Sequence, residues 1–228
     1  MTIAEEYLKK LQEREPQLFP EPLRKSALTD GDIIEIERAL GRRLPEQYKE
    51  FLQSYQLPET MTVYISFCGD SYANSFSDTF SREKNEYVPV DWDNDLSTLV
   101  DMEWQNFNAS NAAEWLKQLE DVDLAVASAC LEAGYIYLGM FYEESYYVLY
   151  DLVKGEVVDI HHEAVYDLSY ELGDVWEGGM PETLREGMVT YGHTLCRNFN
   201  DYLRLVCTGE HYDEDDMVFV KEEDLEDY

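Results

Sequence analysis

Basic residues are scarce in this chain. Lys and Arg total 17 of 228 residues whereas Asp and Glu total 49, so the formal net charge is −32. A surface with this excess of negative charge repels nucleic acid and anionic membranes, and it attracts basic partners. Direct binding to a phosphate backbone is therefore nearly ruled out, and a basic protein is the kind of partner to expect.

Cysteines and long apolar runs are also few. The four cysteines are widely scattered, which is typical of buried thiols in a cytosolic protein and not of a disulfide scaffold. No apolar run approaches the ~20 residues that a membrane span requires. The first ten residues lack the basic segment and apolar run of a signal peptide. Together these features predict a cytoplasmic protein.

The negative charge is concentrated after residue 60. Residues 1–60 hold nine basic and 12 acidic residues, whereas residues 61–228 hold eight basic and 37 acidic residues. Residues 210–228 alone contain ten acidic residues against Lys221. Such a run is typical of a solvated, frayed tail, although it could also mimic a polyanion. Residues 217–220 are apolar, interrupt the run and are a candidate short strand.

Apolar spacing predicts three helices near the N-terminus. Residues 2–14 form the first, and three prolines between residues 16 and 22 break the chain into a linker. Thr29 is a good N-cap for the second helix, and Gly41 suits its left-handed C-terminal residue. Pro45 fits the first position of a third helix, whose buried stripe includes Tyr48 and Phe51.

The remaining chain reads mostly as strands. We expect strands at residues 62–67 and 135–140, a hairpin at 146–160, and helices at 110–120 and 194–207, with an irregular segment at 161–192. This order favours an α+β fold in which N-terminal helices pack on a mostly antiparallel sheet, followed by a C-terminal helix and an acidic tail. We expect one domain over residues 1–228: a helix and linker at 1–27, a core at 28–208 and a tail at 209–228.

One stretch resembles the opening signature of the SUKH superfamily, which includes bacterial immunity proteins and yeast regulators of cell-wall synthesis. The signature consists of an acid in the first helix, a Leu-Gly pair, a Leu-Pro pair and an aromatic-Lys-x-Phe-Leu run. The chain carries these as Glu37, Leu40-Gly41, Leu44-Pro45 and Tyr48-Lys49-Glu50-Phe51-Leu52. The resemblance covers residues 28–57 well and 124–208 loosely. Two departures are Tyr55-Gln56-Leu57-Pro58, where the family usually has Asn-Gly, and an apparent insertion at residues 161–192.

Two groups of residues could ligate a metal. His193, Cys196, Cys207 and His211 have zinc-like inner spacings, but the predicted helix between the cysteines separates them by ~16 Å. Asp91, Asp93 and Asp95 open like a calcium loop, but the loop lacks its glycine and its terminal glutamate is one position late. We expect no metal, no cofactor and no catalytic residue.

The resemblance implies a non-catalytic binding protein, and we predict an immunity protein. Such a protein would occlude a basic toxin of nuclease or deaminase type with its acidic surface. One alternative is an intracellular regulatory scaffold or adaptor that binds an endogenous protein. A less favoured alternative is a cation-dependent hydrolase. The residues predicted to contact the partner are acidic residues and tryptophans of two segments: Asp91, Trp92, Asp93, Asp95, Asp101, Glu103, Asp167, Glu171, Asp174, Trp176 and Glu177.

Overall fold

A computed structural model describes residues 1–19, 21–57, 60–68, 78–81, 86–89, 97–103, 133–141, 146–161, 164, 181–213, 216–221 and 223. The helices are α1 (Ile3–Arg14), a 3-10 turn (Pro16–Leu18), α2 (Asp30–Leu40), α3 (Glu46–Leu52), α8 (Pro181–Tyr191) and α9 (Phe199–Thr208). The strands are β1 (Arg24–Lys25), β2 (Tyr55–Gln56), β3 (Thr60–Cys68), β4 (Asp78–Ser81), β5 (Glu86–Pro89), β6 (Ser97–Glu103), β7 (Tyr135–Phe141), β8 (Tyr146–Asp151), β9 (Val157–His161), β10 (Gly192–Cys196), β11 (His211–Asp213) and β12 (Val218–Val220). Every helix in these ranges is too short or too polar to cross a membrane.

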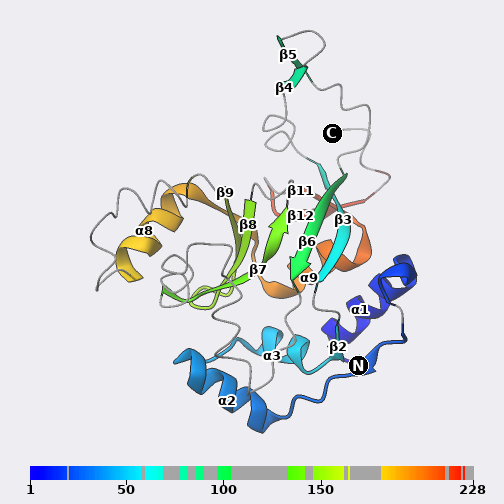
Figure 1. The fold of residues 1–228 in the computed structure, drawn as a ribbon, viewed down its shortest axis with the longest axis vertical. Coiled ribbons are helices and arrows are strands. Elements are labelled where there is room, and N and C mark those ends of the chain that lie inside the picture. The colour runs from blue at the N-terminus through cyan, green and yellow to red at the C-terminus, as the bar shows by residue number, and fades with distance from the viewer. Residues whose placement is uncertain are drawn as a thin grey trace.

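The main sheet confirms the predicted α+β class. Its strands lie in the order β10-β9-β8-β7-β6-β3-β11-β12. Figure 1 shows β9, β8, β7, β6 and β3 side by side in this sheet. All neighbours are antiparallel except β11 and β3, which run parallel. β1 pairs with β2, and β4 pairs with β5, in two separate ribbons. The mostly antiparallel sheet, the N-terminal helices and the C-terminal helix therefore agree with the predicted fold class.

The second helix begins and ends where its cap residues predicted. The Thr29 hydroxyl accepts the backbone N–H of Asp32 at 3.3 Å, and the Asp32 carboxylate accepts the backbone N–H of Thr29 at 2.8 Å. Gly41 ends the helix with φ 65°, a left-handed conformation that costs glycine little. The Glu37 carboxylate then accepts the backbone N–H of Leu44 at 2.9 Å. These contacts close the corner between α2 and α3.

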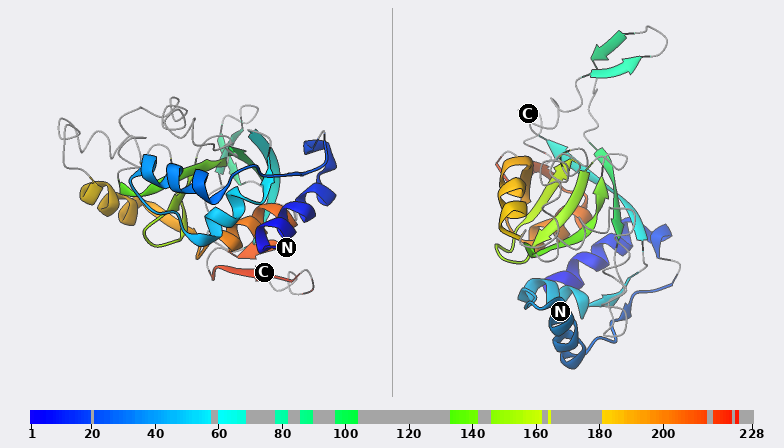
Figure 2. Two further views of the ribbon diagram at one scale, coloured as in Figure 1. Left: turned by 90° about the horizontal axis from the view of Figure 1, so that it is seen from below. Right: turned by 60° about the vertical axis from the view of Figure 1, so that its left-hand side comes forward.

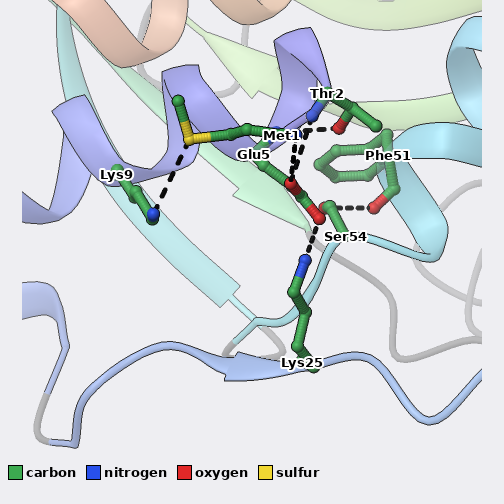
Figure 3. Close-up of polar contacts among 7 residues, drawn as sticks. All are labelled: Met1, Thr2, Glu5, Lys9, Lys25, Phe51 and Ser54. Carbon is green, nitrogen blue, oxygen red and sulfur yellow. Dashed lines mark hydrogen bonds and ion pairs between the residues drawn. The ribbon is translucent and has the colours of Figure 1, made fainter.

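Short polar contacts fix the first helix and its linker (Figure 3). Thr2 and Glu5 form a reciprocal capping box, with bonds of 3.2 Å and 3.1 Å. The Lys25 ammonium donates to the Glu5 carboxylate, which ties β1 to the start of α1. At the end of α3, the buried Ser54 hydroxyl donates to the carbonyl of Phe51 at 2.5 Å. The N-terminal segment is thus held by bonds between its own residues.

An aromatic cluster joins the helices to the sheet. The ring centroid of Phe199 lies 5.0 Å from that of Tyr48, 5.2 Å from Phe51 and 5.2 Å from Tyr150. Phe199 is fully buried at the start of α9. Figure 2 shows α1 and α9 side by side, and the Arg14 guanidinium donates to the carbonyl of Val206 at 3.0 Å. The core therefore lies between these helices and one face of the sheet.

The predicted helix at residues 194–207 is wrong in its first part. Residues 192–196 form β10, which pairs with β9, and α9 begins only at Phe199. The Asn198 side chain accepts the backbone N–H of Asp201 at 3.1 Å, so Asn198 is the true N-cap. Pairing with β9 overrides the helical spacing of the residues before that cap.

Two other predictions near the C-terminus can be compared with the structure. The segment at 161–192 was expected to be irregular, but residues 181–191 form α8, with Pro181 as its first residue. The apolar residues at 217–220 were a candidate strand, and β12 confirms it from Val218 onward. The predicted helix at 110–120 lies outside the described residues.

Candidate partner-binding surface

β6 carries the two predicted contact residues that the structure describes. Asp101 is paired with Thr62 of β3 on one side and with Met140 of β7 on the other, and Glu103 is paired with Thr60. β6 has neighbours on both sides in the sheet. The two acidic positions are therefore on a strand inside the sheet and not on an edge strand.

The register places both acids on the sheet face that α9 does not cover. Val63 and Ile65 of β3 are buried in the core, and Val63 is paired with Val100 of β6. Paired residues share a face and successive residues alternate between faces. Asp101 and Glu103 therefore occupy positions on the face opposite the α9 core.

The other predicted contact residues are not placed by the structure. They fall in the stretches between β5 and β6 and between β9 and α8, outside the described residues. Their contribution to a binding surface stays a prediction. These residues are Asp91, Trp92, Asp93, Asp95, Asp167, Glu171, Asp174, Trp176 and Glu177.

An ion pair between a partly exposed arginine and a buried aspartate joins α8 to the end of β8. The Arg185 guanidinium donates to the Asp151 carboxylate at 2.7 Å and to the carbonyl of Ala133 at 2.7 Å. The other oxygen of Asp151 accepts the backbone N–H groups of Val153 at 2.8 Å and Lys154 at 3.0 Å. Asp151 is only 1% exposed, so its charge is neutralised inside the protein and does not face a partner.

Sequence reasoning missed the role of this pair. Asp151 and Arg185 are 34 residues apart, so no local periodicity connects them. A partial signal is present at the turn, because Asp151 precedes Gly155 by four positions and Asp side chains cap such turns. Gly155 has φ 79°, and its N–H donates to the carbonyl of Asp151 at 2.7 Å. The pair stabilises the fold and fixes α8 against the sheet.

A second buried acid lies at the β9–β10 edge. The Asp159 carboxylate is 3.3 Å from Nδ1 of His193, whose side chain is 75% exposed. Burial raises the pKa of Asp159, and the contact with His193 offsets part of that rise. The pair therefore joins a buried carboxylate of β9 to an exposed imidazole of β10.

The buried thiols are poor candidates for chemistry. Cys196 and Cys207 are both free and fully buried. Burial raises the pKa of Cys207 to about 12 and raises the pKa of Cys196 as well. A protonated, buried thiol is neither a nucleophile nor a metal ligand. In the part of the chain that the structure describes, no three His, Cys, Asp or Glu side chains are grouped to hold a metal ion.

Comparison with known families identifies the fold. The model of the SMI1/KNR4 family (SUKH-1) matches residues 27–205, over three quarters of the chain. The chain belongs to this family. SUKH-1 members are generally non-catalytic binding proteins, and they include immunity proteins and related regulators. The SUKH-1 match begins just before α2 and ends within α9, so α1, β11 and β12 lie outside it.

Neither the curated proteins nor the solved structures contain a match to this chain. The family assignment therefore rests on the SUKH-1 match and on the helical corner that carries its signature. In that corner Glu37 and Gly41 have structural roles, because one accepts the N–H of Leu44 and the other ends α2. These two residues of the signature therefore help to build the corner between α2 and α3.

Proposed function

We propose that this chain is a non-catalytic immunity protein. It would neutralise a basic toxin of nuclease or deaminase type by covering the groove in which that toxin binds nucleic acid. SUKH-1 membership supports the class of protein, and the charge distribution supports the kind of toxin.

The observation that carries the proposal is an excess of carboxylates in residues 61–228. This region has 37 acidic and only eight basic residues. Even if every basic residue there paired with a different acid, 29 carboxylates would have no Lys or Arg partner within the region. Such a surplus gives no stability to the monomer, because unbalanced like charges repel one another. A basic partner would remove that repulsion on binding.

Several described basic residues of this region already contact carboxylates of the same chain. Arg204 binds Glu210 through two bonds of 2.7 Å and 3.0 Å, and Arg185 binds Asp151. Lys221 is 3.4 Å from Glu223. These cations are therefore used within the chain, which leaves the acidic surface for a partner.

The proposed mechanism is occlusion by charge and shape. Carboxylates at Asp101 and Glu103, with the acidic segments around Asp93 and Asp174, would pair with toxin Arg and Lys side chains in place of phosphates. Tryptophans such as Trp92 would supply apolar anchors. Opposite charges on the two proteins would also accelerate their association.

The test is co-expression with the protein encoded by the neighbouring gene. We expect the two proteins to co-purify and the chain to prevent toxin-induced growth arrest. The double variant Asp101→Asn with Glu103→Gln should weaken protection. A matched control, Glu13→Gln with Glu50→Gln, makes the same change in charge at exposed positions of α1 and α3.

Three results would contradict the proposal. The neighbouring protein could fail to bind, or it could bind and prove to be no toxin. The control variant could also lose as much protection as the β6 variant, which would mean that net charge and not a defined surface is responsible. Capture of an endogenous protein without any toxin would favour a regulatory scaffold instead.

A further inference from the structure

Within the described residues, β12 is the outermost strand on its side of the main sheet. It is paired with β11 on one side only, through Val218 with Asp213, Phe219 with Tyr212 and Val220 with His211. The outer edge of a terminal strand presents backbone N–H and C=O groups that another extended chain can bind.

Side-chain contacts hold β11 and β12 against the rest of the protein. The guanidinium carbon of Arg204 is 3.9 Å from the ring centroid of Phe219, and the Tyr212 ring is 4.9 Å from that of Phe219. The Tyr212 hydroxyl donates to the carbonyl of Leu195 at 2.8 Å, and β11 runs parallel to β3. β12 is therefore held in strand geometry before any partner arrives, which lowers the entropic cost of adding a strand.

The edge carries both apolar and acidic side chains. Val218 is 44% exposed. Exposed acids precede and follow the strand at Asp216 and Glu223, and the exposed Lys221 lies 3.4 Å from Glu223. Residues 210–228 contain ten acids and Lys221 as their only Lys or Arg. An extended segment that alternates basic and apolar residues complements this edge in both respects.

The same charges decide between two possible occupants. A second copy of this chain would bring its own acidic run against the first, and like charges in register repel. A basic segment would instead be attracted. The edge is thus protected against self-association while it remains open to a chain of opposite charge.

We propose that β12 is a docking edge for an extended segment rich in Lys and Arg, which adds to the sheet as a further strand. The inference deepens the proposed function and rests on it for the nature of the partner. The partner would then have a basic, extended segment in addition to the groove in which it binds nucleic acid.

Two short peptides test the proposal on the full chain. One alternates Lys and Val, and the other alternates Lys and Pro. The two carry the same charge, but proline has no N–H for strand pairing. We expect the Lys-Val peptide to bind about tenfold more tightly and to slow amide hydrogen exchange at residues 218–220. The variant Asp216→Asn with Glu223→Gln should weaken that binding, whereas Glu13→Gln with Glu50→Gln should not.

Equal binding of the two peptides would overturn the proposal, because it would show charge attraction without strand addition. The same conclusion would follow if neither peptide bound, or if exchange slowed elsewhere and not at β12. None of these results depends on the toxin. Failure of strand addition therefore leaves protection by the β6 face to be judged separately in the co-expression test.

Discussion

Residues 1–60 and residues 61–228 differ in how their charges are matched. In the first region nine basic residues accompany 12 acids, and short-range pairs such as Arg38 with Glu35 and Lys10 with Glu6 lie along the helices. In the second region eight basic residues accompany 37 acids. In the first region, charged side chains cap helices and form ion pairs along them. The second carries 29 more acidic than basic residues (37 − 8), a pattern that agrees with the proposed basic partner.

The two regions nevertheless share one core, and Phe199 is its centre. Its ring contacts Tyr48 and Phe51 of the helical region and Tyr150 of the sheet. Phe199→Ala should lower the free energy of unfolding by about 3–5 kcal/mol, measured by urea denaturation. Phe219→Ala, at a half-buried ring, is the milder comparison. A loss below about 1 kcal/mol at Phe199, or separate unfolding of the two regions, would show that they do not share a core.

Ion pairs in the two regions should differ in their contribution to stability. Asp151→Asn should cost about 3 kcal/mol, because it leaves the largely buried Arg185 without its charged partner. Glu35→Gln, which removes a surface pair with Arg38, should cost at most about 1 kcal/mol. Equal costs at the two sites, in the same denaturation assay, would contradict this distinction.

Two glycines, one inside α2 and one at its C-cap, should respond to alanine in opposite directions. Gly41 has φ 65°, so Gly41→Ala should destabilise the protein by about 1 kcal/mol even though no atom lies within 4 Å of the added Cβ. Gly31 is inside the helix, and Gly31→Ala should stabilise the protein by up to about 1 kcal/mol. Thermal unfolding of both variants measures these two changes in stability. Stabilisation by Gly41→Ala would mean that the corner does not depend on a left-handed residue.

The smallest expected effect concerns pH. Burial raises the pKa of Asp159 in the folded state above its unfolded value, so the folded protein retains a proton that the unfolded chain loses. This contribution to stability is present below the unfolded pKa and is lost as pH rises toward the folded pKa. Asp159→Asn should therefore raise Tm near pH 7 relative to wild type. It should also reduce the fall in Tm that accompanies a rise in pH above about pH 4. An Asn variant that is less stable than wild type near pH 7 would contradict this account.

Much of the helical region could be predicted from sequence because its signals are local. Thr29 caps a helix through a residue three positions away, and Gly41 ends it through its own backbone freedom. The hairpin of β8 and β9 likewise depends on a short turn that contains Gly155. None of these features requires knowledge of distant residues.

Features that depend on distant residues could not be predicted. β11 is parallel to β3, which pairs His211 with Ser66 across more than half of the chain. The beginning of α9 was misplaced because β10 acquires its strand conformation only from β9. For the candidate surface, the acidic character of Asp101 and Glu103 was evident, but their position opposite the α9 core required the register of β6.

The acidic surface is proposed to bind a basic protein through its charge. The most direct test is the affinity for the co-purified partner between about 0.05 M and about 0.5 M salt. We predict that Kd rises at least about tenfold over this range, and that Asp101→Asn with Glu103→Gln reduces the salt dependence more than Glu13→Gln with Glu50→Gln does. An affinity that does not change with salt would contradict the account.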